Sequence, residues 1–181
     1  MRVFGTVGLP GSGKGEAAAV AREAGIPVVT MGDVIREACR DRGLDPAEHH
    51  GEVAQTLREE DGEAAIAERS LPLIREALEG SGTVLVDGLR SPAEVARFED
   101  AFGDDFVVVE VEAPFETRVE RLADRGRDAS DADREALRAR EERERGFGMD
   151  EVMADADVTV DNTGALDAFR ARIRDLLEAE P

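Results

Sequence analysis

The residues of this sequence whose types and spacing most clearly support chemistry lie near its start, between Gly8 and Glu16. They fit the pattern G-x-x-x-x-G-K, in which successive backbone N–H groups turn toward phosphate oxygens and the lysine reaches between two phosphates. A helix that begins directly after such a loop adds about half a positive charge at its N-terminus. We therefore expect a nucleotide-phosphate site formed by Gly8, Leu9, Pro10, Gly11, Ser12, Gly13, Lys14, Gly15 and Glu16.

Lys14 is the only lysine in the chain, and every other residue with a permanently charged basic side chain is an arginine. This usage indicates that a compact, flexible ammonium group is needed at this one position. Gly15 stands where a serine or threonine usually follows the lysine, so the loop offers no hydroxyl to a metal ion. We expect Mg²⁺ to keep mostly water ligands there, with Asp87 in its outer shell.

Three further residues are candidates for the same site. Asp87 ends an apolar run, and a carboxylate at the carboxyl end of a buried strand near a phosphate loop is well placed for Mg²⁺. Arg36 and Arg90 carry planar guanidinium groups that suit phosphate oxygens. The alternatives are turn chemistry with Gly88 for Asp87 and ordinary salt bridges for the two arginines.

Short apolar runs alternate with helical patterns, and these elements must position the candidate residues. The strands are expected at 3–7, 26–31, 83–87, 106–111 and 157–160. The helices are expected at 16–23, 34–40, 45–78 with a break near 61–62, from 92 and from 114 onward, and at 165–178. This alternation predicts an α/β fold of three layers, a five-stranded parallel sheet with helices on both faces. Ligands of such sheets bind at the carboxyl ends of the strands.

We expect one domain over 1–181 with two additions to the basic pattern. Residues 37–80 form a helical insertion that holds an acceptor, because a plain strand–helix–strand crossover needs only about a dozen residues. Residues 125–150, rich in arginine and bracketed by glycines, form a lid. Most lid arginines are expected on a charged helix face, with Glu141 four residues before Arg145. Adjacent His49 and His50 are expected to be exposed and without a role.

The composition limits the partners. The chain has a net charge of −19, with 42 acidic against 23 basic residues, so nucleic acids and anionic membranes would be repelled. Such an acidic, lysine-poor chain is typical of a salt-adapted protein, whose surface charges need screening. The single Cys39 excludes an internal disulfide, is expected to be buried, and favours a reducing, cytoplasmic compartment. No targeting or membrane segment is expected.

Several segments resemble the nucleoside monophosphate kinases. The loop Gly8–Gly15 is similar to that of adenylate kinases. Met31–Arg36 resembles their T-G-D-x-x-R segment with Met31 replacing the threonine, which implies that Arg36, with Arg90, binds the acceptor phosphate. Asp87–Arg90 is similar to their D-G-x-P-R turn, one residue shorter and without the proline. Glu120–Arg125 resembles the helix that enters their lid, which implies that Arg121 contacts the adenine and that Arg125 acts on the phosphates. The stretch Val158–Gly164 looks like the end of dephospho-coenzyme A kinases, and the whole chain is similar to an archaeal family of P-loop proteins related to both.

The residues and the resemblance together predict an enzyme that uses ATP and Mg²⁺. It would move the γ-phosphoryl group to a nucleotide-like acceptor, a nucleoside monophosphate or dephospho-coenzyme A. Lys14, Asp87 and Arg125 are the expected catalytic residues. The alternative is a P-loop regulator or ATPase that binds ATP and has no acceptor, which the altered acceptor segment at Met31 favours.

Overall fold

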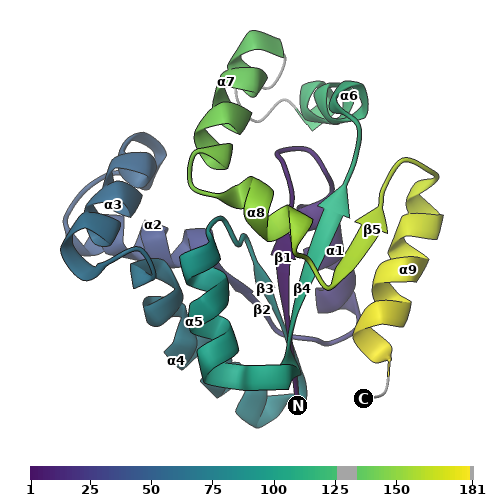
Figure 1. Cartoon of the computed structure of the whole chain (residues 1–181), viewed down its shortest axis with the longest axis horizontal. Helices are drawn as coiled ribbons and strands as arrows, with labels where there is room; N and C mark the ends of the chain where they lie inside the picture. The colour runs from purple at the N-terminus through teal and green to yellow at the C-terminus, as the bar shows by residue number, and fades with distance from the viewer. Residues whose placement is uncertain (126–133, 180–181) are drawn as a thin grey trace.

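The computed structural model describes residues 1–125 and 134–179, with only the backbone described at Arg125. Five strands occur in the described part of the chain, all of them in one parallel sheet. They are β1 (Arg2–Val7), β2 (Val28–Thr30), β3 (Thr83–Asp87), β4 (Phe106–Glu112) and β5 (Val158–Asp161). The order across the sheet is β2-β3-β1-β4-β5, so β1 lies in the middle (Figure 1). The phosphate loop follows directly after the carboxyl end of β1. The expected α/β class and five-stranded parallel sheet are confirmed.

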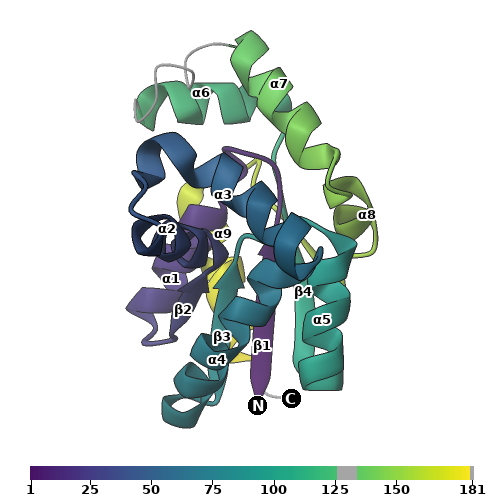
Figure 2. The ribbon, with the colours of Figure 1, turned by 90° about the vertical axis from the view of Figure 1, so that its left-hand side faces the viewer.

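Alternating side chains along the strands form two cores, as a period of two residues requires. On one face Val3 and Val7 of β1 pack with Val84 and Val86 of β3 beneath helices α2, α3, α4, α5 and α8. On the other face Phe4 packs with the alanine-rich side of α1 and with the apolar side of α9. Figures 1 and 2 show these helices covering both faces of the sheet, which confirms the three expected layers.

The helices of the described residues follow the order of the expected ones, with one addition. They are α1 (Lys14–Glu23), α2 (Met31–Asp41), α3 (Pro46–Asp61), α4 (Ala65–Gly80), α5 (Pro92–Phe102), α6 (Phe115–Arg125), α7 (Arg134–Arg145), α8 (Met149–Ala154) and α9 (Leu166–Glu178), with a short 3₁₀ turn at Gly103–Asp105. The break expected near residue 61 separates α3 from α4. The six-residue α8 was not predicted, because so short a segment shows little periodicity.

Local capping explains where several helices begin. Asp45 accepts a hydrogen bond from the Ala47 backbone N–H, and Pro46 occupies the first position of α3. At α5 the Ser91 hydroxyl accepts from the Glu94 backbone N–H over 3.3 Å. One boundary was wrong: Met31, expected at the end of the second strand, is the first residue of α2, so β2 is only three residues long.

Helices α6 and α7 lie beyond the carboxyl ends of β1 and β4, above the phosphate loop (Figures 1 and 2). The expected lid segment 125–150 thus includes α7 and the start of α8, while Gly126 and the arginine at 127 lie outside the described residues. Within the described residues, none of the helices combines the length and the apolar character that a bilayer-crossing helix requires.

The free energy of unfolding is expected to rise with salt. Most ion pairs of the described residues are at the surface, such as Arg42–Glu60 and Arg69–Asp61, and exposed pairs contribute only about 0–1 kcal/mol each. Repulsion within a net charge of −19 acts more on the compact state than on the unfolded chain, and molar salt reduces the screening length to about 3 Å. The melting temperature, measured without nucleotide from low salt to several molar KCl, should increase. A flat or falling curve would contradict a salt-adapted surface.

Candidate functional site

The phosphate loop joins β1 to α1, and its lysine lies at the edge of a cavity. Lys14 donates hydrogen bonds from Nζ to the carbonyl oxygens of Gly8 and, over 3.4 Å, Leu9. Burial lowers the pKa of Lys14 to about 8, with opposing contributions from Asp87 and Glu144, which raise it, and further lowering by Arg90 and Arg140. The folded protein therefore disfavours the protonated form of Lys14, and a bound anionic phosphate would stabilise that form.

The loop is packed from behind by the segment that follows β5. Asn162, buried at 3 % exposure, donates from Nδ2 to the Ser12 carbonyl over 2.7 Å. A Cβ on Gly13 would lie 2.2 Å from that nitrogen, and Gly13 has φ 122°, so only glycine fits here. Asn162 was not among the expected site residues, since nothing in its neighbourhood indicates a contact with residue 12.

A buried arginine connects the loop to the lid. Arg118 of α6 donates from Nη1 to the Pro10 carbonyl over 3.2 Å and forms an ion pair with Glu141 of α7. Its Nε donates to the Ala113 carbonyl over 2.9 Å, and its guanidinium lies 5.5 Å from the centre of the Phe115 ring. The expectation that Glu141 lies on a solvated face is wrong: Glu141 is buried at 7 % exposure and its partner is Arg118.

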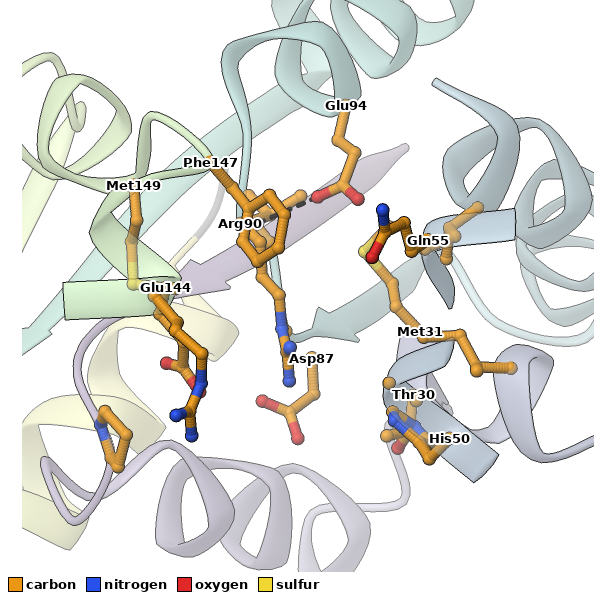
Figure 3. A pocket seen from close by; sticks show the side chains of 18 of the residues that line it. Thr30, Met31, His50, Gln55, Asp87, Arg90, Glu94, Glu144, Phe147 and Met149 are labelled. Carbon is orange, nitrogen blue, oxygen red and sulfur yellow. Dashed lines mark hydrogen bonds between the residues drawn. The ribbon is translucent and has the colours of Figure 1, made fainter. Parts of the chain in front are cut away.

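Asp87 lies at the carboxyl end of β3, where three strands end side by side. The sheet register places it opposite Thr6 of β1 and Thr30 of β2. The Thr6 hydroxyl donates to Asp87 Oδ1 over 2.9 Å, which fixes the carboxylate, and Figure 3 shows the Asp87 side chain pointing into the cavity. The carboxylate is thus held in place beside Lys14.

The cavity beside the loop measures about 1110 Å³, enough for more than one small ligand. It brings together Lys14 and Asp87 with both expected acceptor arginines. Six basic residues line it against three acidic ones, although the whole chain carries −19. The basic lining residues are Lys14, Arg36, Arg58, Arg90, Arg140 and Arg143. A positive cavity in an acidic protein concentrates anionic ligands.

The two acceptor arginines differ in their partners. Arg36 is paired with Asp33 one turn earlier, at 2.6 Å between Nη2 and Oδ1, as its salt-bridge alternative requires. Among the described residues the Arg90 guanidinium forms no ion pair or hydrogen bond. It extends into the cavity toward Asp87 (Figure 3), while the Arg90 backbone N–H donates to Glu94 Oε2 over 2.8 Å.

The buried ion pair between Arg58 and Glu94 supports the turn that carries Arg90. Glu94, only 1 % exposed, also accepts from Arg58 Nη2 over 3.3 Å, and burial raises the pKa of its carboxyl group. The Arg58 guanidinium lies 5.0 Å from the centre of the ring of Phe147, the second residue after α7. Helix α3, the turn at Arg90 and the base of the lid therefore meet at one place.

The expectation that both histidines are exposed is wrong, because each is only partly exposed. His49 faces outward and pairs with Glu52 at 3.0 Å. His50 lines the cavity with Arg36 and Arg90, and Figure 3 shows it beside Thr30.

Arg121 and Glu16 lie around the loop rather than in the cavity. Arg121 of α6 donates to the carbonyl oxygens of Ser12 over 3.3 Å and of Asn162 over 2.7 Å. Glu16 pairs with Arg170 of α9, which ties α1 to the last helix. Arg125 ends α6, and its side chain lies outside the described residues.

The residues present fit a nucleoside triphosphate with its metal ion. A desolvated lysine at a glycine loop, in a cavity lined mainly by basic side chains, suits a chain of phosphates. Within residues 1–125 and 134–179 no cluster of three or more His, Cys, Asp or Glu residues is arranged to hold a metal. One carboxylate, Asp87, with phosphate oxygens and water is the ligand set that Mg²⁺ commonly uses.

The sequence is similar to a family model and to several archaeal proteins. A family model described as AAA domain matches residues 7–138. A UPF0200 protein of Halobacterium salinarum is 62% identical over 180 residues, covering 99% of this chain and 94% of the relative. A UPF0200 protein of Methanoculleus marisnigri is 46% identical, covering 98% of this chain and 96% of the relative. The UPF0200/UPF0201 protein of Archaeoglobus fulgidus is 49% identical over 98% of this chain and 55% of its own length.

Two solved structures share the fold. TT1252 from Thermus thermophilus superposes with a TM-score of 0.68 at 23% identity, over 99% of this chain and 98% of its own. Shikimate kinase from Acinetobacter baumannii in complex with shikimate gives a TM-score of 0.53 at 20% identity, over 97% and 92% of the two chains. These similarities show a kinase-like P-loop fold.

Proposed function

Because the chain belongs to the UPF0200 family and has a kinase-like P-loop fold, we propose that it is an ATP- and Mg²⁺-dependent phosphotransferase acting on a nucleotide-like acceptor. The acceptor is a nucleoside monophosphate or dephospho-coenzyme A. The observation that carries this proposal is the meeting of Lys14, Asp87 and Arg90 in one positively lined cavity at the carboxyl ends of parallel strands. ATP on the loop and an acceptor beyond Asp87 would then lie end to end.

Each residue has a distinct task in this scheme. The backbone N–H groups from Gly11 to Gly15 hold the β-phosphate, and Lys14 contacts the β- and γ-phosphates. Mg²⁺, beside Asp87, would neutralise the phosphate charge. An acceptor oxygen forms a bond to the γ-phosphorus while the bond from that phosphorus to the β–γ bridging oxygen breaks. A phosphate acceptor has no proton to lose, whereas a hydroxyl acceptor requires a base, and Asp87 is the placed carboxylate.

The proposal extends to the two additions around the sheet. The insertion 37–80, which includes α3 and α4, would hold the acceptor, since Arg58 and His50 of α3 line the cavity. The lid 125–150 would close over the phosphates with Arg125 and Arg121. Cytoplasmic localisation and small-molecule nucleotide partners complete the proposal.

Arg36 and Arg90 are expected to act on the acceptor alone. Arg36→Ala or Arg90→Ala should raise the acceptor KM about tenfold or more, or lower kcat, with the Kd of ATP nearly unchanged, because each removes a charge-assisted contact on the acceptor side. Steady-state kinetics and ATP titrations check this. Arg40→Ala is the matched control, since Arg40 is exposed on the same helix as Arg36. Weakened ATP binding in either variant would instead assign that arginine to the donor.

The paired state of Arg36 also favours the second candidate, an ATP-binding regulator or ATPase without an acceptor. A panel of AMP, CMP, UMP and dephospho-coenzyme A with ATP distinguishes the two. Formation of a phosphorylated acceptor supports the kinase. Release of inorganic phosphate alone, or stable ATP binding without turnover, supports the regulator or ATPase.

A further inference from the structure

His50 lies where the acceptor would enter, although it belongs to none of the expected site residues. It is near the start of α3, in the helical insertion, and its ring is directed toward the cavity beside Thr30 (Figure 3). Arg36 reaches the same region from α2, and Arg90 reaches it from the turn after β3. Three separate elements thus bring nitrogen-bearing side chains to one end of the cavity.

Gly32 shows how closely two of these side chains approach. A Cβ built on Gly32 would lie 3.4 Å from Arg36 Nη1, 3.6 Å from Arg36 Nη2 and 3.7 Å from His50 Nε2. The guanidinium and the imidazole therefore both approach the Cα of Gly32, which carries no side chain. Donors that converge in this way suit the several oxygens of a tetrahedral anion.

The charges that face His50 are positive. Burial lowers the pKa of His50, the charges of Arg90 and Arg36 lower it further, and only the nearby Gly32 carbonyl opposes them. Asp33, an acidic residue of α2, is paired with Arg36. His49 has the reverse setting: its hydrogen bond with Glu52 raises its pKa. His50 is therefore neutral in the free protein near pH 7, beside two permanent cations.

We propose that His50 completes, with Arg36 and Arg90, a binding site for the phosphate monoester of the acceptor. This proposal rests on the proposed phosphotransferase function and deepens it, because it assigns the acceptor a phosphate group next to α3. A non-phosphorylated hydroxy compound would not use a third donor here.

The pH dependence has a defined sign. A dianionic phosphate between His50 and the arginines offsets their repulsion, so binding raises the pKa of His50 and takes up a proton. Acceptor affinity should therefore increase as the pH falls from about 8 toward 6.5, above the second pKa of the phosphate itself at about 6. The acceptor contributes little to this change while it remains a dianion.

The test compares His50→Gln with His49→Gln, the neighbouring histidine outside the cavity. AMP and CMP are titrated by calorimetry against protein in which AMP-PNP and Mg²⁺ fill the donor site. His50→Gln should weaken binding about tenfold at pH 6.5, the loss of one charge-assisted hydrogen bond, and should flatten the pH dependence. His49→Gln should retain the wild-type affinity and pH dependence. Equal affinities for wild type and His50→Gln overturn the proposal.

The wild-type protein supplies a readout that needs neither a stable variant nor catalysis. The chain has two histidines, so their imidazole proton resonances are readily separated by NMR, and the His49→Gln spectrum assigns them. AMP should shift the His50 titration to higher pH and leave that of His49 in place, and inorganic phosphate tests whether the phosphate group alone suffices. An unmoved His50 titration overturns the proposal. Phosphorylation of AMP or CMP with an unmoved His50 would leave the proposed function standing, whereas a shifted His50 without any transfer would support the site and reject the kinase.

Discussion

Lys14→Ala is expected to lower the rate of phosphoryl transfer about a thousandfold and to weaken ATP binding, without loss of the fold. The ammonium group is the positive charge of the phosphate loop itself, and removing one placed donor from a transition state with developing charge typically costs a factor of 10² to 10³. Lys14→Arg should also fail, because a planar guanidinium replaces a compact ammonium poorly in this cradle. Transfer assays and ATP titrations measure both effects.

Stability and pH give independent checks of the same residue. The folded state lowers the pKa of Lys14 to about 8, so Lys14→Met should melt at a temperature at least as high as wild type. ATP affinity in the wild type should fall as the pH rises through about 8, because the free protein then loses the Lys14 proton that the phosphates require. Arg22→Ala, an exposed charge on the same helix, should leave activity unchanged. Full activity of Lys14→Ala would refute the phosphate-loop assignment.

Asp87→Asn is the second substitution with a large expected effect, a loss of about 10² to 10³-fold in transfer. The Thr6 hydroxyl, 2.9 Å from Asp87 Oδ1, can hold an asparagine in the same orientation, so the change removes charge with little change of shape. Mg²⁺ titrations in the presence of ATP should show weaker metal binding. Glu112→Gln removes an exposed carboxylate from the end of β4, which β1 separates from β3, and should have no effect. Full activity of the Asp87→Asn enzyme would show that Asp87 has only a structural role in the turn with Gly88.

Local signals in the sequence predicted the parallel sheet correctly and placed Asp87 at the end of a strand, while the roles of Asp87 and the loop residues stay predictions. A glycine pattern with lysine, an acid at the end of an apolar run, and alternation of strands with helices each depend on neighbouring residues. The short α8 and the exact start of α2 escaped prediction, because short elements and boundaries depend on packing. Asn162 and the Arg118–Glu141 pair depend on contacts between distant segments, which spacing along one helix cannot reveal.

His50 was different, because a usable signal was present. Val53, Ala54 and Leu57 form the buried side of α3, and His50 precedes them by three, four and seven residues. The helical period therefore places His50 near the packed side and His49 away from it. The prediction treated both histidines alike and therefore missed the difference in their positions on α3.

The contact between Asn162 and the phosphate loop has a consequence for the synthesis of the protein. The loop is made within the first fifteen residues, but the side chain that holds the Ser12 carbonyl comes from residue 162, after the last strand of the sheet. On the ribosome, most of the chain must emerge before that support exists, since folding follows the order of synthesis. A nascent chain that ends before Asn162 therefore lacks the contact that holds the Ser12 carbonyl, so the loop and its support are made at widely separated times during synthesis.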